Sequence, residues 1–205
     1  MQLVFATTNP HKLQEMREIL GPLGVAVTGL ADLGRVVPEP EETATTLEGN
    51  ARLKAVSYAR ALGRTCLADD SGLEVDALDG APGIHSARYA GHGGTRDQRD
   101  HENRKKLLAE LARRAPKTRA ARLVCTLCVA DATGRVVFEA RGTAEAEISE
   151  EPRGEHGFGY DSVLYLRDVN KTVAELTPAE FNLRSHRGAA ARALHAWLKS
   201  EGLTH

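Results

Sequence analysis

Aromatic residues and unbalanced charge are both scarce in this sequence of 205 residues. Aromatic side chains make up 4% of the chain while hydrophobic residues make up 41%, so we expect an aliphatic core. The formal net charge is −1, which argues against a large sequence-independent surface for DNA or RNA, because such a surface needs an excess of basic residues. The charge leaves binding of a single nucleotide open.

The sequence also lacks long apolar runs, and its number of cysteines is odd. No stretch approaches the ~18 apolar residues of a transmembrane helix, and residues 1–6 lack the basic start and the length of a secretory signal. The three cysteines, Cys66, Cys125 and Cys128, lie in strand-like segments. Cys125 and Cys128 have CxxC spacing, but residues three apart on a strand face opposite sides, so we expect no zinc or redox site. Together these absences predict a protein of a reducing cytoplasm without a membrane partner.

The acidic pair Asp69-Asp70 is the feature around which the rest of the chain is organised. An apolar run at 66–68 precedes the two acids, and Ser71-Gly72 follows them. This pattern predicts a buried strand that ends at the acids and opens into a loop, with the carboxylates in the crevice where open α/β sheets bind ligands. Oxygen ligands of this kind suit Mg²⁺. The alternative is an acidic turn, because Asp, Ser and Gly are common turn formers.

A second candidate site lies between the first strand and the first helix. Residues 3–7 predict a strand, and Asn9 followed by Pro10 predicts a helix start, with a stop at Gly21-Pro22. The connecting residues are Thr7, Thr8, Asn9, Pro10, His11 and Lys12. Hydroxyls, an amide and a lysine at a helix N-terminus suit a phosphate group, although the glycines of a Walker loop are absent. The alternative is an ordinary capped helix with a solvated lysine.

An acidic loop over residues 38–48 precedes the next helix. The loop contains Glu39, Glu41, Glu42 and Glu48, and most such charges are merely solvated. Thr45 and Glu48 form a capping-box pattern, so we expect a helix to begin after Thr45 and to end at Gly63. Lys54 on this helix is either a surface lysine or a phosphate partner.

The second half of the chain adds a hairpin and two polar segments. Apolar residues on both alternating faces of 121–130 predict a central strand, and 120–148 reads as a β-hairpin. The Gly-rich segment 154–161 contains aromatics and an acid that suit stacking on a base and reading its edge; the alternative is a flexible connector. His186-Arg187 suits a phosphate or base contact, or is only a polar helix start.

Seven motifs carry a family resemblance that spans Leu3 to about Leu198. They are Thr7-Thr8-Asn9-Pro10-His11-Lys12, Glu41-Glu42-Thr43, Ala68-Asp69-Asp70-Ser71-Gly72, Pro82-Gly83-Ile84, Ser86-Ala87-Arg88-Tyr89, Phe158-Gly159-Tyr160-Asp161 and Ser185-His186-Arg187. In this order they closely resemble the inosine/xanthosine triphosphate pyrophosphatases, also called Ham1-like. The resemblance implies Mg²⁺-dependent hydrolysis of ITP, dITP and XTP to the monophosphate and pyrophosphate. It also implies a homodimer and an α/β fold, with a long mixed β-sheet flanked by helices and two lobes around a central active-site cleft, as a single domain over residues 1–205.

The same resemblance implies roles for individual residues. Asp70 takes the position of the catalytic proton acceptor and metal ligand, and Glu41 that of the second metal carboxylate. The residues implied to contact the substrate are Thr7 to Lys12, Lys54, Ser71, Phe158, Gly159, Tyr160, Asp161, His186 and Arg187. Asp69 and Asp70 point to opposite sides of a strand, so only one need touch the metal. Lys12, Lys54 and Arg187 would stabilise charge on the leaving pyrophosphate.

One departure from the family pattern concerns Phe181, which stands where a nucleotide-contacting lysine is expected. Arg184 replaces an apolar residue three positions later and shares a helix face with Phe181, so it is a candidate to supply the missing donor; alternatively both residues are structural. Two other functions compete with the implied one. The first is a Maf-like nucleotide pyrophosphatase acting on other bases, which the ordered motifs disfavour. The second is a nucleotide-binding regulator that no longer turns over.

Overall fold

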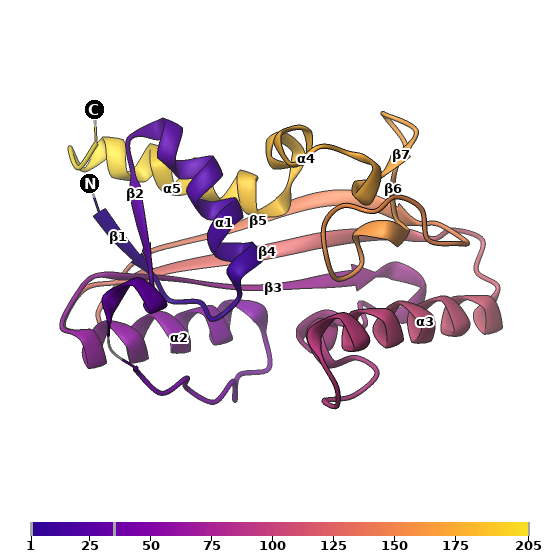
Figure 1. Ribbon diagram of the computed structural model, residues 1–205, viewed down its shortest axis with the longest axis horizontal. Helices are drawn as coiled ribbons and strands as arrows, with labels where there is room; N and C mark the ends of the chain where they lie inside the picture. Colours follow the sequence, from indigo (N-terminus) through magenta and orange to yellow (C-terminus); the bar gives the residue numbers. More distant parts are fainter. Residues whose placement is uncertain (1, 35, 205) are drawn as a thin grey trace. The chain divides into compact units, whose positions relative to one another are not determined.

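The computed structural model describes residues 2–34 and 36–204, which form a mixed seven-stranded sheet of order β2-β1-β3-β4-β5-β6-β7 (Figure 1). The strands are β1 (Gln2–Phe5), β2 (Ala26–Gly29), β3 (Cys66–Val75), β4 (Ala120–Ala130), β5 (Val136–Ile148), β6 (Leu164–Leu166) and β7 (Lys171–Thr172). β1 is parallel to β2 and to β3, whereas β6 is antiparallel to β5 and to β7. The expected α/β class with a mixed sheet is confirmed.

Five α-helices accompany this sheet within the described residues. They are α1 (Pro10–Leu20), α2 (Leu47–Leu62), α3 (Arg96–Arg114), α4 (Pro178–Arg184) and α5 (His186–Ser200). Asn9 caps α1 and Pro10 is its first residue, as expected. The cap of α2 was expected at Thr45 and is Thr46 instead, because the Thr46 hydroxyl accepts from the Gly49 amide at 3.0 Å. None of the described helices has the length and hydropathy that crossing a membrane requires.

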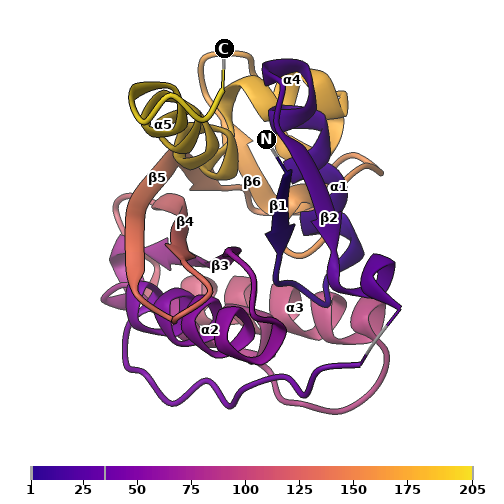
Figure 2. The same ribbon diagram turned by 90° about the vertical axis from the view of Figure 1, so that its left-hand side faces the viewer.

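The chain divides into two compact units, each with its own core. Unit 1 comprises Met1–Asp70, Cys125–Gly142 and Ser185–His205, and unit 2 comprises Ser71–Val124 and Thr143–Arg184. In unit 1, α1 and α5 pack on one face of the sheet and α2 on the other (Figure 2). Successive strand residues point to opposite faces, so Leu67 belongs to one cluster and Ala68 to the other. The same alternation in β4 confirms the expected central strand buried on both faces.

Unit 2 has a single apolar cluster. Leu107 and Leu111 of α3 are fully buried in it, together with Leu73 and Val75 from the end of β3. The hydrophilic remainder of α3 is expected for a helix that buries only one narrow stripe. That the two units work as one domain with a central cleft stays a prediction.

The acidic pair lies in the middle of a strand, so the expectation that the strand ends at Asp69-Asp70 is wrong. β3 continues through both acids and on to Val75. The Thr126 hydroxyl donates to the Asp70 carbonyl at 3.2 Å. A Cβ on Gly72 would lie 2.4 Å from the Gly83 carbonyl oxygen. Gly72 therefore allows another backbone segment to approach closely and does not form a turn. Packing in the sheet overrides the turn preference of Asp, Ser and Gly.

Candidate active site

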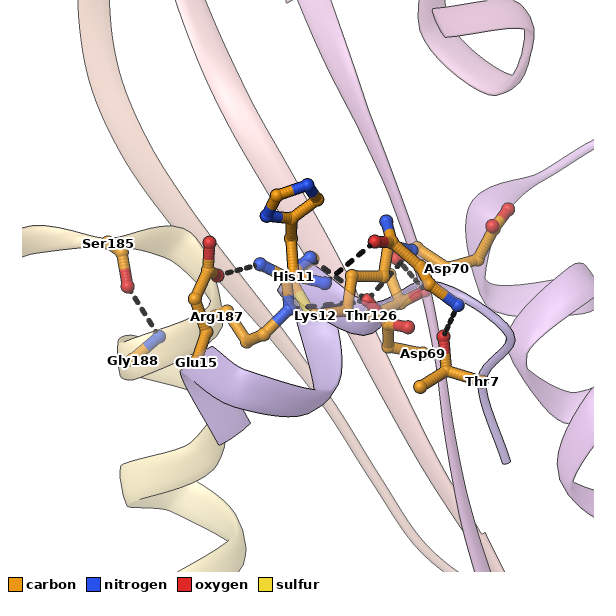
Figure 3. A network of polar contacts seen from close by, with 12 residues as sticks. Thr7, His11, Lys12, Glu15, Asp69, Asp70, Thr126, Ser185, Arg187 and Gly188 are labelled. Carbon is orange, nitrogen blue, oxygen red and sulfur yellow. Dashed lines mark hydrogen bonds and ion pairs between the residues drawn. The ribbon is translucent and has the colours of Figure 1, made fainter. Parts of the chain in front are cut away.

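Asp69 and Asp70 are neighbours on β3 with different ion-pair partners, and Figure 3 shows the polar network around them. The partners of Asp69 come from α1 and α5, whereas the partner of Asp70 comes from α2. This arrangement confirms that neighbouring strand residues point oppositely. The two carboxylates therefore have different surroundings and different chemical prospects.

Asp69 is the centre of a buried ionic cluster. Its Oδ2 lies 3.0 Å from Lys12 Nζ and 3.1 Å from Arg187 Nη2, and Arg187 also forms an ion pair with Glu15 through Nη1. The side chains of Asp69 and Arg187 are each 1% exposed. Burial alone would raise the pKa of Asp69, but Lys12 and Arg187 hold it well below its ordinary value. These two cations therefore favour the ionised form of Asp69, whose negative charge offsets theirs.

Asp70 has a single lysine partner that it shares with a second acid. Lys54 Nζ lies 2.9 Å from Asp70 Oδ1 and 3.0 Å from Glu42 Oε1. Burial raises the pKa of Asp70 above its ordinary value although Lys54 opposes the shift. The Lys54 side chain is only 8% exposed, so the surface-lysine alternative is wrong. One ammonium group thus bridges two carboxylates next to the phosphate-type loop.

Glu42 has a contact with Lys54 that the sequence did not predict. Glu41, the expected second metal carboxylate, is exposed, whereas its neighbour Glu42 is half-buried and reaches Lys54. The Ala44 amide donates to Asn50 Oδ1 at 3.1 Å, which ties this part of the loop to α2. The sequence offered one signal, the spacing of an acid and a lysine around a helix start, but it did not distinguish the two adjacent glutamates.

The phosphate-type loop lies at the N-terminus of α1, as expected. Thr7 Oγ1 accepts from the Asn9 amide at 3.2 Å, and Asn9 Oδ1 accepts from the His11 amide at 3.1 Å. Thr8 is exposed and its hydroxyl donates weakly to Glu39 at 3.4 Å. Lys12 is turned toward Asp69. The structure therefore brings this loop, Lys54 and both acids together within unit 1.

His186 and Arg187 belong to the same unit but are buried at the start of α5. Burial and the neighbouring Arg187 lower the pKa of His186 well below its ordinary value, so this imidazole is neutral. The guanidinium of Arg187 donates to Glu15 and to Asp69 from three of its nitrogens. This geometry favours a supporting role for Arg187 over the direct contact that the resemblance implies.

The expected base-reading loop lies in unit 2, as do Ser71 and Phe181. The Phe158 amide donates to Asp161 Oδ2 at 2.8 Å, and the Tyr160 hydroxyl donates to the Ser86 carbonyl at 2.9 Å. The Asp161 carboxylate therefore holds the loop itself, and these bonds argue against a flexible connector. Ser71 is a half-buried residue of β3.

Phe181 belongs to the apolar core of unit 2, with 9% of its surface exposed. It lines a cavity of about 180 Å³ together with Arg184, which lies 3.5 Å from Asp168 in an ion pair. The spacing correctly placed Arg184 beside Phe181. That Arg184 supplies a donor to a nucleotide stays a prediction, and its partner Asp168 favours a structural role.

We expect Phe181→Lys to destabilise the protein, because it removes an aromatic ring from the apolar cluster of unit 2 and puts an ammonium group in its place. A loss of about 3 kcal/mol corresponds to a fall in Tm of roughly 6–12 °C for a chain of this size. Leu183→Lys is the matched control, because Leu183 is on the same helix and 76% exposed. Equal Tm values for the two variants in scanning calorimetry would contradict the core role of Phe181.

Comparison with known proteins gives one consistent answer over almost the whole chain. Residues 3–197 match the model of the Ham1 family. The chain is 47% identical over 196 residues to the dITP/XTP pyrophosphatase of an Exiguobacterium species, covering 96% of both chains. It is 43% identical over 199 residues to the dITP/XTP pyrophosphatase of Bacillus subtilis, covering 97% of this chain and 98% of the other.

Solved structures agree with these sequence matches. The structure of a HAM1 protein from Coxiella burnetii is similar with a TM-score of 0.86 and 38% identity, covering 98% of this chain and 99% of the other. The Staphylococcus aureus Ham1 protein gives a TM-score of 0.83 with 37% identity, covering 98% of this chain and 100% of the other. The match to the family model, the similar relatives and the similar solved structures together show that this chain belongs to the Ham1 family.

Proposed function

We propose that this protein hydrolyses non-standard purine nucleoside triphosphates, namely ITP, dITP and XTP, to the nucleoside monophosphate and pyrophosphate. Relatives that share more than two-fifths of its residues over almost their full length are named dITP/XTP pyrophosphatases. The observation that carries the proposal is the pair of clusters on β3, which places Lys12 and Lys54 with two carboxylates beside a helix N-terminus. Such an arrangement suits a polyanionic substrate.

We further propose Mg²⁺ as the cofactor, held by Asp70 and a carboxylate from Glu41 or Glu42. The fit rests on Lys54, whose single ammonium already lies within hydrogen-bond distance of Asp70 and Glu42 and so marks a place suited to a cation. No cluster of three or more metal-binding side chains is present in the described part of the chain. Mg²⁺ needs only one or two protein carboxylates when substrate phosphates and water complete its octahedron. When bound, it would neutralise phosphate charge and polarise the phosphorus–oxygen bonds.

The chain's own residues then have distinct tasks. Asp70 orients the attacking water and accepts its proton, because it is the carboxylate on the α2 side of β3 beside the proposed cation. Lys54 beside Asp70 and Lys12 at the start of α1 each supply a positive charge for the phosphates. Arg187 acts indirectly, because its ion pair with Asp69 holds that carboxylate in place.

Base selection is proposed to belong to the loop Phe158–Asp161. A 6-oxo purine has an acceptor at position 6 and a ring N–H, whereas adenine has an amino donor at that position. A site built for the first pattern leaves a polar group unpaired against the second, which can discriminate by about 10⁴. The half-buried Phe158 offers an aromatic face for stacking.

The test is a Mg²⁺-dependent assay of pyrophosphate release with ITP, dITP, XTP and dATP. We expect pyrophosphate and the monophosphate as products, little release without Mg²⁺, and a kcat/KM for dITP far above that for dATP. Orthophosphate as the only product, with no contaminating pyrophosphatase, would refute cleavage between the α and β phosphates. A dATP value within tenfold of dITP would refute the selectivity, and binding without turnover would favour the regulator.

We also propose a cytoplasmic homodimer without a nucleic-acid polymer or a membrane as partner. The basis is the family membership together with the near-neutral charge and the reduced cysteines. Light scattering coupled to gel filtration would test the dimer, and a monomer at micromolar concentration would contradict it.

A further inference from the structure

One side of α3 carries three residues that contact two consecutive residues of the base-reading loop. Arg96, Asp100 and Arg104 are spaced by four, which places them along one side of the helix. Arg96 Cζ lies 5.5 Å from the centre of the Phe158 ring. Asp100 Oδ2 accepts from the Gly159 amide at 2.9 Å, and Arg104 Nη1 donates to the Gly159 carbonyl at 2.5 Å. All of these residues belong to unit 2.

The two bonds to Gly159 hold both peptide groups that flank it. Gly157 and Gly159 adopt left-handed φ angles of +80° and +61°, a conformation that favours glycine and leaves Phe158 between two flexible points. Charged partners make stronger hydrogen bonds than neutral ones. Asp100 and Arg104, which lie on α3 outside the loop, therefore restrict the backbone flexibility that the two glycines would otherwise give the loop.

We propose that Asp100 and Arg104 are specificity-positioning residues: they clamp Gly159 so that Phe158 and its loop meet a purine in one fixed orientation. This inference rests on the proposed function, because it deepens the role of the same loop. Neither residue need touch the base. The clamp matters because discrimination between a 6-oxo and a 6-amino purine depends on where donors and acceptors lie, and a mobile loop can adjust to either.

Arg96 adds a related contact from the same side of α3. The guanidinium of Arg96 attracts the Phe158 ring through a cation–π interaction and so limits the positions that the ring takes. A base that stacks on the other face of the ring would then meet a preset surface. The bonds at Gly159 remain the stronger element, because they act on the backbone.

The experiment compares Asp100→Ala and Arg104→Ala with controls on the same helix. Glu102→Ala matches the loss of an acid and Lys105→Ala the loss of a base, since both residues are exposed. For each protein, kcat and KM are measured with dITP and dATP in Mg²⁺, and Tm is measured by calorimetry. We expect the dITP to dATP ratio of kcat/KM to fall about tenfold or more in both clamp variants, mainly through a higher KM for dITP. Arg104→Lys, which keeps a charged donor, should recover part of the ratio.

Three results separate the possible explanations. If clamp variants lose activity toward both substrates by the same factor, the residues only stabilise the fold and the proposal is overturned. A ratio within twofold of that of the unmodified protein also overturns it, provided that the controls behave alike. Failure of the unmodified protein to prefer dITP refutes the proposed function itself, and the inference that depends on it falls with it. If an alanine variant does not fold, Arg104→Lys carries the test through the same ratio.

Discussion

Replacing Asp70 by asparagine should lower kcat about 10³-fold or more while Tm stays nearly unchanged. Asparagine keeps the shape of the side chain but removes the base and the charge that a cation needs, and general-base catalysis alone contributes about 10² to 10⁴. Lys54 keeps Glu42 as a partner in this variant, so no buried ammonium is left alone. Steady-state kinetics with dITP and a thermal melt measure the two quantities.

Asp69→Asn is the comparison that gives this prediction its meaning. Asp69 faces the other side of β3 and neutralises Lys12 and Arg187. The loss of its charge should therefore mainly lower stability, and it should affect the proposed Mg²⁺ site at Asp70 less. Breaking a buried ion pair by removing one partner costs about 3–5 kcal/mol. If the two variants lose equal activity with equal stability, the assignment of the catalytic role to Asp70 rather than Asp69 has no support.

Arg187→Met should destabilise the protein by about 3–5 kcal/mol, which corresponds to a fall in Tm of roughly 10 °C. The methionine fills much of the space but leaves the carboxylates of Asp69 and Glu15 without the cation that lies between them. Chemical denaturation with an unchanged m-value would confirm a true loss of stability.

Two further variants control this prediction. Arg192→Met changes an exposed arginine of the same helix and should leave Tm within about 1 °C. Glu15→Gln in the Arg187→Met background should recover part of the stability, because it removes the charge of Glu15, which has lost its ion pair with Arg187, whereas Asp69 keeps Lys12. A variant with normal Tm and only a raised KM for dITP would instead make Arg187 a direct substrate contact.

The sequence predicted those elements whose signals are local. Asn9-Pro10 marked the start of α1, and ahead of α4 the pattern of Thr177 and Glu180 is that of a capping box, whose bonds the structure contains. Each of these signals works through bonds between residues within four positions of each other, so no knowledge of distant partners was needed.

Tertiary structure decided what depends on partners far apart in the chain. The strand through Asp69-Asp70 continues because β4 and the backbone around Gly83 pack against it, although the local residues favour a turn. Arg187 forms an ion pair with Glu15, 172 positions away in the chain, and its burial in this contact favours a supporting role. Of two adjacent glutamates, only the fold shows that Glu42 reaches Lys54.

The family could be recognised from motifs in a certain order along the chain, because the motifs of related chains keep their order. The roles of the individual residues could not be predicted from the sequence. Whether a charged side chain meets a substrate or another charge depends on its burial and on the distance to its partners, and these quantities arise only when distant segments pack together.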